Sequence, residues 1–168
     1  MKRKYYKSGL VIALSFWLSA AHANMANHSS SLDSTHLQSV NPKGVSIPGI
    51  SQGMLVNNSN LLFISGQVAM NEKGDIVGSD LKTQLEQVFK NLGKTLSEAG
   101  ANYRDIAKLT VYFRDYKPNK LLVYREVRDK YIQLDNPPAS TIIGVQTLFS
   151  PKVLVEIEAI VTIPQSTI

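Results

Sequence analysis

The sequence PPASTIIGV at residues 137–145, followed by VLVEIEAIV at residues 153–161, decides how the C-terminal part of this chain folds. The double proline ends any helix before it, and a Ser-Pro-Lys turn signal at residues 150–152 separates the two runs. Both runs are rich in β-branched residues and predict strands. Side chains alternate along a strand, so Glu156 and Glu158 point to the same face. Ionised carboxylates in an otherwise apolar strand cost free energy unless they are paired or take part in function. The face that carries them is therefore the predicted location of a functional site.

The elements before this pair begin with a strand signal and a long amphipathic pattern. Residues 54–56 and 61–65 flank a cluster of turn formers at residues 57–60, and this arrangement predicts a hairpin. Apolar residues at 3.6-residue spacing then predict a helix from about residue 80 to residue 99. The apolar stripe of this helix must be buried against another element of the same domain.

Residues 106–113 predict a further strand, and a second helix opens near Pro118, which suits a first helical turn, and stops before the double proline. The resulting order β-β-α-β-α-β-β predicts an α+β domain in which two helices pack on one face of a mixed sheet. On the strand at residues 106–113, the amphipathic side chains of Lys108, Thr110 and Tyr112 alternate with apolar ones. This pattern favours an oligomer that covers the outer face of the sheet.

The N-terminus has the pattern of a cleavable secretory signal. Basic residues open the chain, an apolar run extends from residue 10 to about residue 20, and an Ala-His-Ala cleavage site ends at Ala23. The apolar run is shorter than the roughly 20 residues that span a bilayer. We therefore predict a signal peptide at residues 1–23, a flexible leader at residues 24–44 and one folded domain at residues 45–168. The mature protein is expected to be periplasmic or secreted, with no membrane association after cleavage.

Composition excludes several kinds of chemistry. The whole chain carries 18 Lys and Arg against 13 Asp and Glu, a net charge of +5. Four of the basic residues lie within the first seven positions, so the predicted mature chain has 14 basic and 13 acidic residues and gives no argument for a nucleic-acid partner. The chain has no cysteine, and its three histidines, at positions 22, 28 and 36, precede the predicted domain. Thiol chemistry, a serine–histidine–aspartate triad and histidine-ligated metals are therefore not expected in that domain.

Four motifs in order give the chain a family resemblance. They are ISGQV at residues 64–68, a Gly-x4-Asp-Ile-x-Lys-x2-Val-Tyr spacing at residues 100–112, Pro-Ala followed by Val145, and VEIEA at residues 155–159. Together they resemble the Rid family of reactive intermediate deaminases, also called the YjgF family. The likeness extends over about residues 45–163, which is the whole predicted domain.

The resemblance implies a chorismate-mutase-like α+β fold and a homotrimer with clefts between its subunits. It also implies a small-molecule substrate and neither cofactor nor metal, because the best-known members hydrolyse enamines and imines such as 2-aminoacrylate to a 2-keto acid and ammonia. Carried onto this sequence, the glutamate that positions the hydrolytic water is Glu156. The substrate-binding positions that match are Ser65, Gly66, Gln67, Ser140 and Thr141.

The chain departs from the family pattern at two positions. Ser140 stands where family members place an arginine that clamps the substrate carboxylate, and Ile50 lies near a position that is often tyrosine. An arginine–carboxylate pair gives two charge-assisted hydrogen bonds, whereas serine offers one neutral donor. The loss predicts at least about a 100-fold lower kcat/KM on an imino acid, unless Arg114 or Arg128 supplies the missing cation.

Each site residue also has a structural interpretation. Glu156 either orients a water or is a structural acid, and Glu158 is expected to pair with Lys152 or with a cation at an interface. Gly66 marks either a β-bulge or the close approach of a ligand. Ser140 either donates to a ligand or bonds locally. The functional alternative to an imine deaminase is accordingly a non-catalytic trimer that binds a small metabolite or a partner protein.

Overall fold

The computed structural model describes residues 36–44 and 47–164. The predicted signal peptide at residues 1–23 and the first part of the predicted leader lie outside the described residues. Neither helix of the described part is long and apolar enough to cross a membrane.

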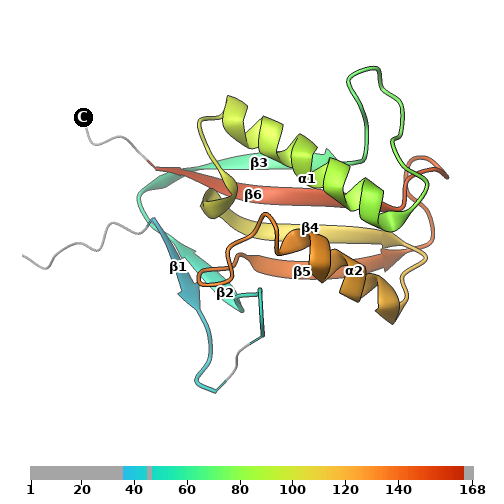
Figure 1. The fold of residues 1–168 in the computed structure, drawn as a ribbon. Coiled ribbons are helices and arrows are strands. Elements are labelled where there is room, and N and C mark those ends of the chain that lie inside the picture. Colours follow the sequence, from blue (N-terminus) through green and yellow to red (C-terminus); the bar gives the residue numbers. More distant parts are fainter. Residues whose placement is uncertain (1–35, 45–46, 165–168) are drawn as a thin grey trace, which may run out of the picture. The chain divides into compact units, whose positions relative to one another are not determined.

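A mixed four-stranded sheet forms one layer of the fold (Figure 1). Its strands, in spatial order, are β3 (Ser59–Gln67), β6 (Val155–Pro164), β4 (Ile106–Arg114) and β5 (Ala139–Val145). Strand β6 runs antiparallel to both of its neighbours, whereas β4 and β5 are parallel. Parallel neighbours need a crossover connection, and the second helix of the fold supplies it.

Two helices form the other layer, and Figure 1 shows both on the same face of the sheet. Helix α1 (Leu81–Glu98) begins where Asp80 accepts a hydrogen bond from the Thr83 backbone N–H at 2.9 Å. Helix α2 (Pro118–Arg128) has its proline in the first turn, as the sequence predicts. A short 3₁₀ helix, η1 (Tyr103–Asp105), leads into β4. The predicted α+β arrangement of two helices on a mixed sheet is confirmed.

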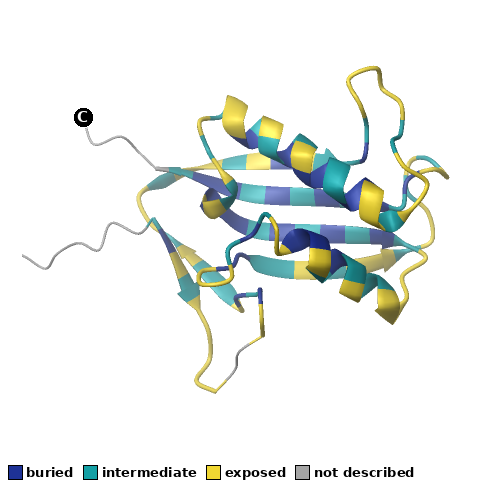
Figure 2. Cartoon of the chain, in the orientation of Figure 1, coloured by how far each residue is buried: buried dark blue, intermediate teal, exposed yellow. Residues whose placement is uncertain are grey.

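The core lies between the two layers (Figure 2). Leu109, Val111 and Phe113 of β4 are fully buried, and they alternate with partly exposed residues on the outer face. Phe89 of α1 is also fully buried, and its ring stacks on that of Tyr131 with 4.9 Å between the centroids. The alternation determines which side chains of each strand point to the outer face, where they can line a site.

A small two-stranded ribbon lies apart from the main sheet and corrects two predictions. Strand β1 (Leu37–Val40) pairs antiparallel with β2 (Gly53–Val56), so residues 37–40 are a strand and not part of a flexible leader. The predicted hairpin between residues 54–56 and 61–65 is wrong, because β2 pairs with β1 while β3 pairs with β6. Asn58, with φ of 44°, turns the chain between β2 and β3. Both ribbon strands have four residues, too few for a clear period in the sequence.

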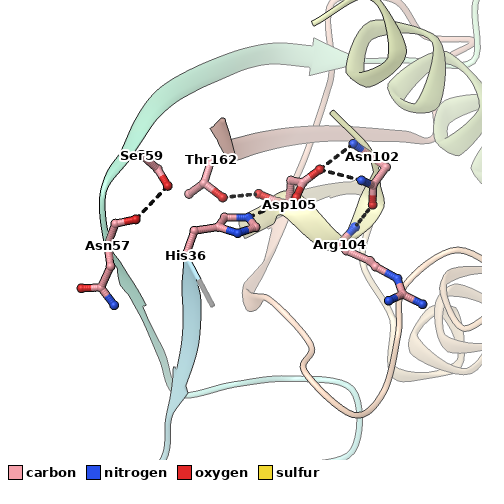
Figure 3. Close-up of polar contacts among 7 residues, drawn as sticks. All are labelled: His36, Asn57, Ser59, Asn102, Arg104, Asp105 and Thr162. Atoms are coloured by element: carbon pink, nitrogen blue, oxygen red, sulfur yellow. Dashed lines mark hydrogen bonds and ion pairs between the residues drawn. The ribbon is translucent and has the colours of Figure 1, made fainter. Parts of the chain in front are cut away.

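A polar cluster around Asp105 ties the start of β1 to η1 (Figure 3). The Asp105 Oδ1 atom lies 3.1 Å from Nε2 of His36. Its Oδ2 atom accepts hydrogen bonds from the backbone N–H and the side-chain amide of Asn102, at 2.8 and 2.7 Å. The Thr162 hydroxyl donates to the Asp105 carbonyl at 3.1 Å. Asp105 is 8% exposed, so these partners replace most of its contact with water.

Replacing Asp105 by alanine is expected to lower the free energy of unfolding by about 2–4 kcal/mol. The substitution removes the buried acceptor of two Asn102 donors and the partner of His36. Urea denaturation of both proteins measures the change. Asp75→Ala, at an exposed turn position, is the control. Equal effects of the two substitutions would contradict a stabilising role for the Asp105 cluster.

Candidate functional site

The two glutamates of β6 share the outer face of the sheet, as their spacing predicts. They alternate with the buried residues Val155, Ile157 and Ala159. Across the sheet, Glu156 lies opposite Tyr112 and Glu158 lies opposite Thr110. The Tyr112 hydroxyl donates a hydrogen bond to Oε2 of Glu158 at 3.0 Å. Glu158 therefore has a partner within its own chain, a tyrosine and not the predicted Lys152.

The side chain of Glu156 approaches Gly66, which lies on the neighbouring strand β3. A Cβ atom built on Gly66 would lie 1.8 Å from Oε1 of Glu156 and 2.6 Å from its Cδ. The pairing of β3 with β6 shifts register between Ile64 and Gln67, so Gly66 also sits at a bulge. The bulge interpretation of this glycine is confirmed, and within the chain the group that approaches it closely is the carboxylate of Glu156.

Gly66 and Glu156 open into a hollow of about 1020 Å³ at the end of β3. Asn91 of α1 shapes one wall, because its side-chain amide donates to the carbonyls of Val68 and Met70 at 2.9 and 2.8 Å. Gln67 folds back so that its side-chain amide donates to the Ser65 carbonyl at 3.1 Å. The other lining residues include Asn71, Glu72, Lys73, Asp75, Gln87, Lys94, Thr95 and Phe149.

Two of these lining residues have no signal in the sequence that points to a site. Asn91 lies beside the apolar stripe of α1, so in the sequence it resembles an ordinary surface residue of the helix. Phe149 precedes the turn before β6, and its side chain is 66% exposed at the rim of the hollow. Among residues 36–44 and 47–164, no group of three or more acidic or histidine side chains is placed to hold a metal ion.

The environment of Glu156 changes its acidity. Partial burial raises the pKa of the Glu156 carboxyl, and the neighbouring Glu158 raises it further. A carboxylate with a raised pKa binds a proton more readily than one in water, so it is a better general base. The hollow thus holds a carboxylate suited to activating a water molecule.

The raised pKa also predicts how stability depends on pH. The folded chain binds the Glu156 proton more tightly than the unfolded chain, so this contribution to stability is present at low pH and is lost as pH rises through the folded-state pKa. Glu156→Gln removes the contribution. We expect the variant to gain stability relative to the unsubstituted protein between about pH 4 and pH 7. Urea denaturation across this range, with Glu98→Gln as an exposed control, measures the gain, and a pH-independent difference would contradict it.

Ser140 and Thr141 lie near the opposite edge of the sheet from this hollow. They belong to β5, which is separated from β6 by β4. Strand spacing and the register place Ser140 on the order of 14 Å from Glu156. Ser140 pairs with Leu109 and faces the helices, whereas Thr141 pairs with Thr110 on the outer face. Within one chain, the predicted site residues therefore form two separate groups.

The two arginines considered as substitutes for a clamp have different surroundings. Arg114 donates from Nη1 to the Pro151 carbonyl, and its Nε lies 3.4 Å from Oδ2 of Asp115. Arg128 is buried, with its guanidinium 5.6 Å from the ring centroid of Tyr124. Arg114 is thus tied to the turn before β6, while Arg128 lies on the helix side of the sheet, the side that Ser140 faces.

Comparison with known proteins settles the family. A family model described as Endoribonuclease L-PSP matches residues 46–163. The chain belongs to the Rid (YjgF) family. Its fold is the chorismate-mutase-like α+β fold that the resemblance implied, which the Rid structures share.

Individual Rid relatives are similar over most of the described part. A RutC family protein of Pyrococcus abyssi is 39% identical over 103 residues, which are 60% of this chain and 77% of that protein. The chloroplast Reactive Intermediate Deaminase A of Arabidopsis thaliana is 32% identical over 109 residues, 64% of this chain and 56% of that protein. The structure of a Rid family protein from Yersinia pestis superposes with a TM-score of 0.71 at 33% identity, covering 76% of this chain and 99% of that one.

Proposed function

We propose that this Rid protein is a hydrolytic deaminase that converts small 2-imino or 2-enamino acids to 2-keto acids and ammonia. The observation that carries the proposal is the Glu156 carboxylate, held against Gly66 in an open hollow with its pKa raised by burial and by Glu158. The likeness to a protein named Reactive Intermediate Deaminase A supports the same reaction class.

The proposed chemistry needs one water and one proton acceptor. Glu156 takes a proton from the water as the water oxygen attacks the imine carbon, and it passes this proton to the nitrogen as the C=N double bond becomes a C–N single bond. The resulting carbinolamine then loses ammonia: Glu156 moves the hydroxyl proton to the nitrogen, the C–N bond breaks with its electron pair on nitrogen, and a C=O bond forms. An enamine first gains a proton at its terminal carbon to become the imine. Each cycle consumes one water and returns the Glu156 carboxylate.

A complete site requires a second copy of the chain. The Glu156 hollow and the Ser140–Thr141 segment are on the order of 14 Å apart in one chain, too far to hold one small molecule. The outer sheet face also exposes Phe63, Leu61 and Ile143, at 70%, 50% and 37%. We propose that these residues pack between subunits of a homotrimer and bring the two groups together across each interface. We further propose that the mature protein acts in the periplasm or outside the cell.

Ser140 favours a second candidate, a trimer that binds a small metabolite without catalysis. Its hydroxyl oxygen is buried toward the helices, so it does not replace an arginine side chain in the Glu156 hollow. A serine at this position leaves the substrate carboxylate without its usual charged partner in the family pattern.

The proposal is tested by release of 2-keto acid from 2-aminoacrylate generated in the assay by a second enzyme. We expect protein purified from cells that express the full chain to release pyruvate faster than the spontaneous hydrolysis. Ser140→Arg is the informative variant. Activity in Ser140→Arg alone would favour the non-catalytic binding protein, and no activity in either protein would contradict the deaminase.

A further inference from the structure

Phe149 is a large, exposed side chain on a segment that is held in place. Isolated apolar side chains on a surface are common and need no special explanation. The turn that follows Phe149 is, however, tied to both layers of the domain. The fully buried side chain of Gln84 accepts a hydrogen bond from the Leu154 N–H at 2.8 Å, and Arg114 of β4 donates to the Pro151 carbonyl. The 66% exposed ring is therefore presented to solvent from a fixed position.

The Phe149 ring borders the same hollow as the Glu156 carboxylate. The connection from β5 to β6, which carries Phe149, lies at the end of the sheet where β3 ends (Figure 1). Val68 and Met70, which follow β3, are further apolar residues among those that line the hollow. The hollow therefore combines a carboxylate suited to activating water with apolar surface.

The hollow is much larger than the smallest substrates of the proposed reaction require. Its volume of about 1020 Å³ is similar to the upper end of the range for pockets that hold drug-sized ligands, roughly 300–1,000 Å³. A three-carbon acid such as 2-aminoacrylate would fill a small part of this space and leave the Phe149 ring in contact with water. A substrate with a large apolar side chain would remove the ring from water, which is favourable.

We infer that Phe149 forms an aryl-binding subsite of the Glu156 hollow, and that the preferred substrates are imino acids with an aromatic side chain. The inference rests on the proposed function, because it names which imino acids the same site takes. Two aromatic rings pack well in offset or edge-to-face arrangements, and this adds to the gain from burying their area. The imine carbon would lie at Glu156 and the aromatic ring of the substrate at Phe149.

Calorimetric titration with phenylpyruvate and with pyruvate tests the subsite without a need for turnover. The two 2-keto acids differ only by the phenyl group. We expect protein purified from cells that express the full chain to bind phenylpyruvate at least about tenfold more tightly than pyruvate, and Phe149→Ala to remove most of this preference. Phe149→Tyr keeps the ring and is expected to keep the preference. Leu122→Ala truncates a side chain of matched exposure, 68%, on α2 and is the control.

The same preference is expected in turnover. An amino-acid oxidase supplies the imine of phenylalanine or of alanine in the assay, and release of the 2-keto acid above the spontaneous rate is measured. We expect kcat/KM to favour the phenylalanine imine, and the ratio of the two values to fall about tenfold in Phe149→Ala. Light scattering on each variant shows whether its assembly has changed.

The outcomes separate this subsite from the proposed reaction. A preference for phenylpyruvate that Phe149→Ala removes supports the subsite even if no imine is hydrolysed. Imine hydrolysis with the same substrate ratio in Phe149→Ala and in the unsubstituted protein would overturn the subsite and leave the deaminase standing. Loss of assembly in Phe149→Ala, with both substrates affected equally, would mean that the ring packs against a second copy of the chain. That result, or no measurable phenylpyruvate binding at millimolar concentration, would also overturn the subsite.

Discussion

Gly66→Ala is expected to reduce imine hydrolysis at least about 100-fold while leaving the fold intact. The new methyl group would occupy the position of the Glu156 carboxylate, because the added Cβ lies 1.8 Å from its Oε1 and 2.8 Å from its Cγ. The atoms it meets belong to a flexible side chain and not to backbone, so the carboxylate can move away at little cost in stability. A displaced general base loses most of its catalytic contribution, which is typically 10²–10⁴-fold.

Steady-state pyruvate release and thermal unfolding measure the two parts of this prediction. Gly53→Ala is the matched control, because a Cβ there would lie at an ordinary 3.7 Å from Val40. We expect melting temperatures within a few degrees for both variants and a loss of rate in Gly66→Ala alone. Full activity in Gly66→Ala would mean that the position of the Glu156 carboxylate does not matter for the reaction.

Phe63→Asp is expected to convert the proposed trimer to monomers and to remove activity with it. The Phe63 side chain is 70% exposed on the outer sheet face, opposite Ile160 of β6, where a small hollow of about 310 Å³ adjoins it. An aspartate at this position would bring a charge into each interface without a partner. Because the Glu156 and Ser140 groups meet only across that interface in our account, we expect kcat/KM to fall at least about 100-fold.

Size-exclusion chromatography with light scattering, at micromolar protein, measures the assembly. Leu122→Asp places the same charge on α2 at a residue that is 68% exposed, on the helix side of the molecule. We expect this control to remain trimeric and active. A monomeric unsubstituted protein, or a Phe63→Asp variant that keeps its assembly, would contradict the covered outer face.

The long elements of the fold could be predicted because their sequence patterns are local. The stripe of α1 and the proline that opens α2 identify both helices, and alternation identifies β4 and β6. Strand β1 could not be predicted in this way. Its four residues become a strand through pairing with β2, and its start is fixed by the contact of His36 with Asp105, 69 residues further along the chain. Pairing of this kind is a property of the folded chain and not of a segment.

The candidate site could be predicted in part. Alternation placed Glu156 on the outer face, and the family motifs singled out Gly66, but the contact between them follows from the bulge in β3. The role of Asn91 as a support for the Val68 and Met70 carbonyls had no signal in the sequence. The position of Arg128 against Gly49 also required the structure, because it depends on how the turn before β2 folds over α2.

The most direct test of the central claim compares the unsubstituted protein with Glu156→Gln in the same 2-aminoacrylate assay. Glutamine keeps the size of the side chain and loses the ability to accept a proton from water. We predict that the unsubstituted protein releases pyruvate above the spontaneous rate and that Glu156→Gln, correctly folded, is at least about 100-fold slower. Equal rates for the two proteins, or no release above the spontaneous rate by either, would contradict a hydrolytic role for Glu156.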